Sequence, residues 1–119
     1  MKLPYIPLMR TYTKTLFFLL AAFLLGSCSN TRDEKRVLIF SKAIKFYHES
    51  IPAGVAAVTK LCQENGIAVD TTTNGAYFQE DSLAKYSTVI FLNTSGEILD
   101  YRQQADFERY IQAGGGYVG

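Results

Sequence analysis

The sequence is poor in the side chains that most often carry out chemistry, because its 119 residues include one histidine and two cysteines. Two cysteines cannot build a disulfide framework or a cysteine-rich zinc site. No G-x-S-x-G segment occurs, and no nucleophilic triad can be assembled around the single histidine, His48. A metal site there would have to recruit carboxylates or residues beyond Gly119, and we predict none.

An excess of one charge is also lacking, since 12 basic residues stand against 11 acidic ones and the formal net charge is +1. Removal of an N-terminal segment that carries Lys2, Arg10 and Lys14 would change this charge to about −2. Proteins that bind nucleic acids present a basic patch to the phosphates, and no such patch is visible. We therefore predict no nucleic-acid partner.

One long apolar run, residues 16–25, follows the basic residues of the N-terminus. A transmembrane helix needs about 20 apolar residues, so this shorter run is typical of the core of a signal peptide. Met9 is an alternative start, because residues 9–14 would still form a basic leader. The N-terminus thus predicts export.

Residues 25–28 (Leu-Gly-Ser-Cys) directly follow this run and resemble the lipobox of bacterial lipoproteins. Cys28 would then receive lipid and become the mature N-terminus, which anchors the protein to a membrane. We predict a signal peptide over 1–27, a polar tether over 28–35 and a lipoprotein of the bacterial cell envelope. The alternative is an ordinary secretory signal in which Cys28 has no special role.

Strand and helix patterns alternate along the rest of the chain. Short apolar runs predict strands, and apolar residues at three- and four-residue steps predict helices. The predicted strands cover 36–41, 67–72, 88–92 and 117–119, and the predicted helices cover 51–65, 80–86 and 101–113. This order indicates an α/β fold with a parallel sheet and helices on both faces, cut off at the fourth strand.

Several short signals mark the ends of these helices. Ser50 is the expected N-cap of the first helix, with Pro52 in its first turn. Asp100 and Gln103 have the spacing of a capping box. The glycines at 114–116 follow a helix and precede a strand, which is the reverse of a phosphate-binding loop, so we interpret them as a helix end and turn.

Two helices show an apolar stripe that is expected to pack against the sheet. Cys62 lies on the first stripe and is therefore predicted to be a small buried hydrophobe rather than a nucleophile. The stripes consist of Ile51, Val55, Val58 and Cys62 in the first helix, and of Phe107, Tyr110 and Ile111 in the last.

Polar residues follow the first and third predicted strands. In a flavodoxin-like strand order, 2-1-3-4, these strands are neighbours and their carboxyl ends meet at the switch point where ligands bind. His48 and Glu49 are the candidate catalytic residues; a surface histidine and a solvated glutamate are the plainer interpretations. The candidate ligand-binding residues are Ser41, Ser50, Asn93, Thr94, Ser95 and Gly96. An imidazole, a carboxylate, hydroxyls and an amide suit a hydroxylated ligand such as a sugar.

Residues 37–42, 46–51, 89–96 and 107–119 resemble, in order, the trehalose-utilisation (ThuA-like) family of the class I glutamine-amidotransferase-like superfamily. The resemblance covers 36–119 and implies a flavodoxin-like sandwich and a link to sugar catabolism. The family's His-Glu-Ser loop matches residues 48–50. Its histidine-bearing turn, where amidotransferases carry their cysteine nucleophile, would follow Gly119, so amidotransferase activity is not implied and the chain is expected to be the N-terminal part of a longer protein.

These observations predict an exported, lipid-anchored ThuA-like domain linked to the catabolism of trehalose or a related glycoside. Its small-molecule sugar ligand would meet His48 as a general acid or base or as a hydroxyl contact. The competing hypothesis is a non-catalytic carbohydrate-binding or scaffolding lipoprotein. A third is an inactive chain whose fourth strand leaves an apolar edge unpaired. The sequence specifies no cofactor and no oligomeric state.

Overall fold

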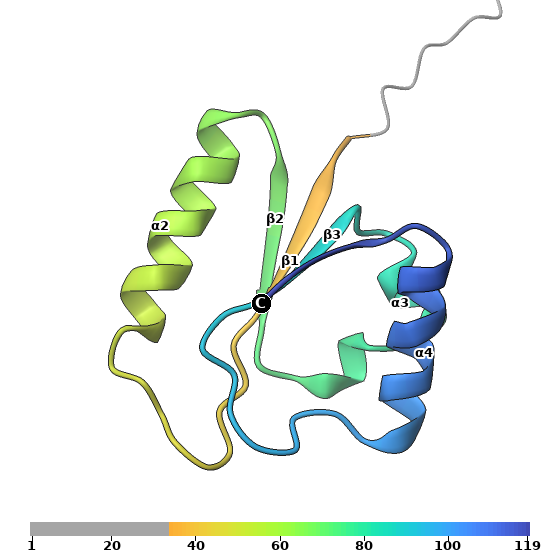
Figure 1. The fold of residues 1–119 in the computed structure, drawn as a ribbon. Coiled ribbons are helices and arrows are strands. Elements are labelled where there is room, and N and C mark those ends of the chain that lie inside the picture. The colour runs from red at the N-terminus through yellow and green to blue at the C-terminus, as the bar shows by residue number, and fades with distance from the viewer. Residues whose placement is uncertain (1–33) are drawn as a thin grey trace, which may run out of the picture. The chain divides into compact units, whose positions relative to one another are not determined.

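The computed structural model of the protein describes residues 34–119, which form a four-stranded parallel sheet with helices on both faces (Figure 1). The strands are β1 (Arg36–Phe40), β2 (Ala68–Thr72), β3 (Thr88–Phe91) and β4 (Gly116–Val118). The helices are α2 (Ile51–Glu64), α3 (Glu80–Leu83) and α4 (Tyr101–Gln112), and a 3₁₀ turn covers Gly75–Tyr77. The predicted signal peptide, the lipidation site Cys28 and most of the tether lie outside the described residues.

The strand order is β2-β1-β3-β4, and every neighbouring pair is parallel. Leu38 in the middle of β1 is opposite Asp70 of β2 and Val89 of β3. The predicted order is therefore confirmed, together with the flavodoxin-like α/β fold that ends at the fourth strand. It makes β1 and β3 neighbours at the centre of the sheet.

β1 is buried on both faces, as its run of apolar residues predicts. Leu38, Ile39 and Phe40 are 0% exposed. Alternate residues of the sheet meet α3 and α4 on one side, where they form the main core. Its buried members are Leu38, Phe40, Phe78, Leu83, Tyr86, Val89, Leu99 and Tyr110. This core fixes the central strands whose ends carry the candidate site.

Helix α2 covers the opposite face of the sheet (Figure 1). Ile51 and Cys62 are its buried residues, while Val55 and Val58 are half-buried. The free thiol of Cys62 is buried, which confirms the prediction for this residue. The helix starts at Ile51 with Pro52 in its first turn, so its N-terminus directly follows the loop that carries His48.

The capping box at the start of α4 is confirmed. Asp100 Oδ1 accepts a hydrogen bond of 2.8 Å from the Gln103 N–H, and Gln103 Oε1 accepts one of 3.0 Å from the Asp100 N–H. Gly114 has φ +98° and ends the helix, as predicted. Because a left-handed φ is strained for residues with a Cβ, glycine suits this position.

One local expectation holds in part and two are wrong. Ser50 occupies the N-cap position of α2 as predicted, but its side chain makes no capping hydrogen bond and its backbone is helical (φ −77°, ψ −9°). Ile111 is 39% exposed because it lies toward the edge of the α4 face that packs on the sheet, so Phe107 and Tyr110 make that contact. The helix expected to reach Tyr86 already ends at Leu83.

β4 pairs with β3 and lies at the edge of the sheet. Tyr117 and Val118 on this strand are 53% and 54% exposed. Among residues 34–119, no helix has the length and hydropathy that a membrane span requires.

Candidate functional site

The loops after β1 and β3 run side by side beyond the ends of their strands. Ala43 and Ser95 form a parallel bridge, in which the Ile44 N–H donates to the Ser95 carbonyl at 2.8 Å and the Ser95 N–H donates to the Lys42 carbonyl at 3.3 Å. The ladder between β1 and β3 therefore continues into the two loops. This confirms that the loop between β1 and α2 (residues 41–50, the histidine loop) and the Asn93–Gly96 turn emerge together at the carboxyl edge of the sheet.

The hydroxyl of Ser95 fastens the histidine loop to the turn. Ser95 Oγ accepts a hydrogen bond of 3.0 Å from the Phe46 N–H and donates one of 2.7 Å to the Phe46 carbonyl. A single hydroxyl thus satisfies both backbone polar groups of one residue. The backbone two residues before His48 is therefore bonded to the turn after β3.

A second contact joins the other end of the same loop. The Asn93 side-chain amide donates a hydrogen bond of 2.9 Å to Ser50 Oγ. Asn93 has φ +49°, a left-handed conformation that asparagine adopts more readily than most residues. Residues 47–49 therefore project between two fixed points, one at Phe46 and one at Ser50.

Gly96 lets the two loops approach closely. A Cβ at this position would lie 3.2 Å from Ile44 Cβ and 3.2 Å from Lys45 Cγ. Its φ of +88° also disfavours a side chain. Glycine is therefore required by both the backbone and the neighbouring loop, which gives this residue a structural role at the site.

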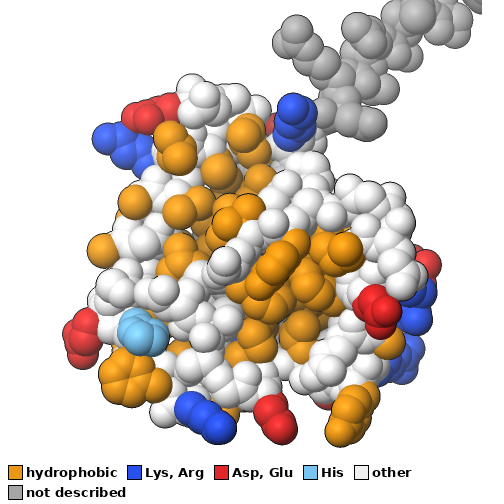
Figure 2. All heavy atoms as spheres, in the orientation of Figure 1, with side chains coloured by type: hydrophobic (Ala, Val, Ile, Leu, Met, Phe, Trp, Pro, Cys, Tyr) orange, Lys and Arg blue, Asp and Glu red, His pale blue; other side chains and the backbone are white. Residues whose placement is uncertain are grey.

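His48 is exposed at the tip of its loop, and its imidazole lies edge-to-face with the Phe46 ring, with 4.7 Å between ring centroids. Figure 2 shows this imidazole, in pale blue, at the surface beside hydrophobic side chains. Glu49 is exposed as well, and within residues 34–119 no hydrogen bond or ion pair joins it to His48. The His48 carbonyl accepts a bond of 3.0 Å from the Ile51 N–H at the start of α2.

Two further candidates, Ser41 and Thr94, are less exposed than His48 and Glu49. Ser41 is buried at 8% exposure, and its N–H donates to the Thr72 carbonyl at 3.1 Å. Thr94 is half-buried on the turn. The structure thus joins Asn93 to Ser50 and Ser95 to the Phe46 backbone through hydrogen bonds, whereas His48 and Glu49 are exposed on the loop between these two contacts. Whether any of these residues binds a ligand or reacts stays a prediction.

Sequence reasoning did not single out Phe46 or Lys42 as parts of this site. Lys42 Nζ donates a hydrogen bond of 3.0 Å to the Ile98 carbonyl and so ties the start of the histidine loop to the segment before α4. Phe46 lies directly against the imidazole. An aromatic residue in a polar loop two positions before a histidine was the signal for Phe46, whereas nothing in the sequence indicates the Lys42 contact.

A cleft of about 420 Å³ lies next to the turn after β3, where it continues toward the start of α4. It is lined by Glu97, Leu99, Asp100, Tyr101 and Gln104. Tyr101 is 92% exposed, so its ring is free to contact a ligand. The lining is a mixture of carboxylate, amide, phenol and apolar groups, which suits a polar small molecule better than an apolar one.

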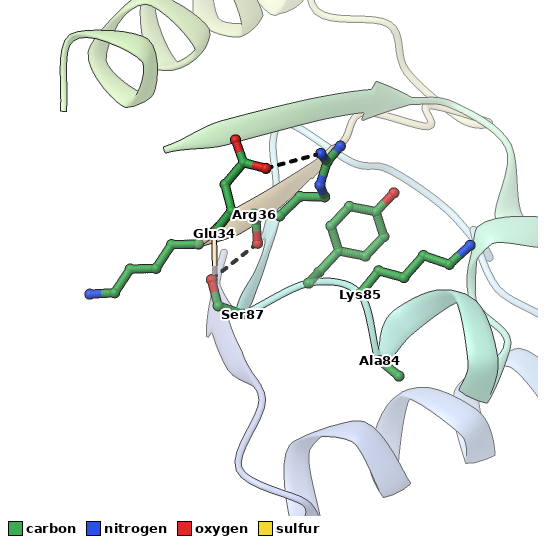
Figure 3. A pocket seen from close by; sticks show the side chains of 7 residues that line it. Glu34, Arg36, Ala84, Lys85 and Ser87 are labelled. Carbon is green, nitrogen blue, oxygen red and sulfur yellow. Dashed lines mark hydrogen bonds and ion pairs between the residues drawn. The ribbon is translucent and has the colours of Figure 1, made fainter. Parts of the chain in front are cut away.

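A different cavity, of about 290 Å³, lies at the amino end of β1, lined by Glu34, Lys35, Arg36, Ala84, Lys85, Tyr86 and Ser87 (Figure 3). Arg36 Nη1 contacts both carboxylate oxygens of Asp70, at 3.2 Å and 3.3 Å. The charge of the Arg36 guanidinium is therefore already compensated by Asp70. It is at the opposite end of β1 from the histidine loop.

Asp70 also accepts a hydrogen bond of 2.9 Å from the Tyr86 hydroxyl. Burial raises the pKa of Tyr86 to about 12, with further contributions from this hydrogen bond and from the negative charge of Asp70. The pair holds β2 to the segment that leads into β3. We interpret it as structural, because it lies away from the carboxyl edge.

No group of three histidine, cysteine, aspartate or glutamate side chains is placed to hold a metal ion in the part of the chain that the structure describes. The side chains at the carboxyl edge include the His48 imidazole, the Glu49 carboxylate and the hydroxyl and amide groups of Ser50 and Asn93. These groups can bind a hydroxylated molecule and exchange a proton with it.

Comparisons with known proteins agree with this geometry. A crystal structure of a ThuA-like protein from Bacteroides uniformis ATCC 8492 is similar to the chain, with 27% sequence identity and a TM-score of 0.60. The similarity covers 72% of this chain and 35% of that protein, so the chain spans about a third of its relative's length. No curated protein matches the sequence. The sequence model of the ThuA family, described as trehalose utilisation, matches residues 36–119, and the chain therefore belongs to the ThuA family.

Proposed function

We propose that the protein is an exported, lipid-anchored ThuA-like domain that acts on trehalose or a related glycoside at the carboxyl edge of β1 and β3. The observation that carries this proposal is the pairing of the histidine loop with the Asn93–Gly96 turn through the Ala43–Ser95 bridge. It gathers the polar candidates at the switch point, where ligands bind in open parallel sheets. The family's description as trehalose utilisation supports a sugar as the ligand.

His48 is the residue proposed to act on the sugar. A histidine changes protonation near neutral pH, so an exposed imidazole can serve as a general acid or base toward a sugar hydroxyl. The same imidazole can instead act as a hydrogen-bonding contact. Glu49 is the second proposed catalytic residue, and Ser41, Ser50 and residues 93–96 are the proposed ligand contacts.

The proposed anchor is Cys28, at the end of the predicted signal peptide. Residue 34 leads into the amino end of β1, whereas the histidine loop leaves its carboxyl end (Figure 1). A chain tethered through its N-terminus therefore attaches at the end of β1 opposite to the proposed sugar site. This arrangement supports a site that stays accessible to soluble sugars.

A non-catalytic carbohydrate-binding lipoprotein is the second candidate, and one observation favours it. The polar side chains of Ser50, Asn93 and Ser95 are engaged with the neighbouring loop, and no carboxylate orients the His48 imidazole within residues 34–119. A general base is usually oriented by a second group. Because the chain spans 35% of its ThuA-like relative, binding and turnover need separate measurements.

The test uses the purified full chain with trehalose and other glycosides, measuring binding by calorimetry and turnover by product analysis. His48→Ala removes the imidazole, and His48→Gln keeps a hydrogen-bonding side chain that does not titrate. Loss of turnover in both variants with binding retained supports acid–base catalysis, and retained turnover in His48→Gln supports a contact role. Sugar binding without turnover in the unaltered chain supports the binding module. Absence of any sugar binding contradicts the proposed function.

A further inference from the structure

We propose that the Phe46 ring is a platform on which the apolar face of a pyranose ring stacks, beside His48 and held in place by Ser95. This inference rests on the proposed sugar function. It assigns a ligand contact to an aromatic residue that does not belong to the core.

Phe46 is 63% exposed, although the core phenylalanines Phe40 and Phe78 are 0% exposed. A single exposed hydrophobic residue is common on protein surfaces and by itself indicates nothing. Phe46 differs because both of its backbone polar groups are bound by Ser95 Oγ, at 3.0 Å and 2.7 Å. The backbone that carries this exposed ring is thus bonded to the turn after β3, and the ring itself lies outside the core.

The Phe46 ring and the His48 imidazole make a pair whose centroids are 4.7 Å apart and whose planes are inclined by 73°. A pyranose has a face of C–H groups and a rim of hydroxyl groups. The phenyl face matches the C–H groups, and the adjacent imidazole matches a hydroxyl on the rim. An apolar wall with one polar group beside it is the usual composition of a small-molecule site.

The size of the exposed ring favours a sugar over a macromolecule. A stable protein interface buries about 800 Å² on each partner. An aromatic side chain buries about 150–250 Å², which is well below the area of an interface. Ile44 and Tyr47 of the same loop are also exposed, at 56% and 57%, but three side chains are far fewer than the roughly 20–30 residues that each side of an interface contributes.

Ser95 is the positioning residue for this platform. A loop that is ordered before binding does not lose its conformational entropy when the ligand arrives, so the affinity is higher. Ser95 supplies this order through one side chain, and the Asn93–Ser50 bond fixes the far end of the loop. The Ser95 hydroxyl is engaged with the Phe46 backbone, so its removal should weaken sugar binding through the loop as well as through any contact of its own with the sugar.

The experiment measures binding of trehalose and glucose to the full chain, with sorbitol as an open-chain control that lacks a pyranose face. Saturation-transfer NMR identifies which sugar C–H groups lie against an aromatic ring. Phe46→Ala should weaken binding about tenfold and remove the C–H signals, and Phe46→Trp should retain both, since aromatic contacts contribute about 0.5–1.5 kcal/mol beyond buried area. Tyr47→Ala is the matched control, because Tyr47 lies in the same loop and is 57% exposed.

Ser95→Ala should weaken binding about threefold or more and make the C–H signals weaker and less selective, whereas Ser95→Thr, which keeps the hydroxyl, should restore both. Equal losses of sugar affinity in Phe46→Ala and Tyr47→Ala would contradict the proposed role of Phe46. Sorbitol binding as tight as glucose binding would contradict it as well. The proposed function would survive that result if the sugar still binds and depends on His48. If the unaltered chain binds no sugar, both proposals fail.

Discussion

The side-chain amide of Asn93 donates a hydrogen bond of 2.9 Å to Ser50 Oγ, so a residue of the turn after β3 holds the residue that precedes α2. The two residues are 43 positions apart in the chain. Ser50 occupies the N-cap position of α2, but its hydroxyl makes this contact and no capping hydrogen bond. The same serine thus serves the connection between the loops instead of the helix.

Two substitutions of Asn93 should separate the stability contributed by its side-chain hydrogen bond from the stability contributed by its backbone conformation. Asn93→Gly keeps the φ of +49° accessible and removes the amide, which should cost about 0.5–1.5 kcal/mol of unfolding free energy. Asn93→Ala also strains the backbone and should cost about 1 kcal/mol more. Urea unfolding measures both values. Ser50→Ala combined with Asn93→Gly should cost less than the sum of the single variants, and strict additivity would show that the bond contributes nothing.

The positions of the strands and the capping box of α4 could be predicted because local residue patterns determine them. Four consecutive apolar residues in β1 require burial on both faces, and Asp100 with Gln103 makes a capping box that depends on local spacing alone. The adjacency of β1 and β3 followed from a flavodoxin-like strand order, which the structure confirms. These features placed the correct loops at the correct edge of the sheet.

The contacts inside the site could not be predicted, because they depend on distances that the register of the sheet sets. Ser95 reaches Phe46 across 49 positions of the chain, and nothing in either residue's neighbourhood signals this bond. The Ser50 hydroxyl accepts a hydrogen bond from Asn93 and makes no capping hydrogen bond, although serine strongly favours side-chain capping at this position. The Asp70–Arg36 contact likewise places a charge pair across two strands that were expected to carry mainly apolar residues.

Gly96→Ala should disrupt the loop pairing more than a left-handed backbone alone would explain. Both Gly96 (φ +88°) and Gly66 (φ +68°) are strained by a side chain, but only at Gly96 would the new Cβ meet another loop, 3.2 Å from Ile44 Cβ. Gly66→Ala is the matched control, with nothing within 4 Å of its Cβ, and should cost about 1–2 kcal/mol.

For Gly96→Ala we expect a larger loss of unfolding free energy than for the control, because crowding of well-packed groups adds about 1 kcal/mol or more. Amide chemical shifts of residues 44–48 should also change in this variant and remain unchanged in Gly66→Ala. Equal losses of stability and unchanged shifts would mean that the two loops accommodate the methyl group with no additional loss of unfolding free energy.

Tyr86 should make the stability of the fold decrease at high pH. Burial, followed by the bond to Asp70, raises the pKa of Tyr86 from 10.0 to about 12, so the folded state holds the phenolic proton more tightly than the unfolded state. The stabilisation is fully present below pH 10 and is lost as the pH rises from 10 through 12. A pKa difference of this size between the folded and unfolded states corresponds to about 2–3 kcal/mol of unfolding free energy.

The free energy of unfolding, measured with urea between pH 8 and 12, should therefore decrease less steeply with pH in Tyr86→Phe than in the unaltered chain. Tyr110, whose pKa is also raised by burial, remains in both proteins and accounts for part of the residual decrease. The variant also lacks the hydrogen bond to Asp70, so it should be less stable at pH 8 by about 1 kcal/mol. Parallel pH profiles for the two proteins would contradict this role of Tyr86.

Cys28→Ala should release the protein from the membrane. If the lipobox directs acylation, the unaltered chain incorporates labelled palmitate and sediments with membranes, because each buried CH₂ contributes about 0.8 kcal/mol to anchoring. Cys62→Ala is the matched control, since that thiol is buried in α2 and is not available for acylation. It should stay labelled and membrane-bound. An unaltered chain that is exported but carries no label would instead identify an ordinary secretory signal, and the sugar site would then belong to a soluble protein.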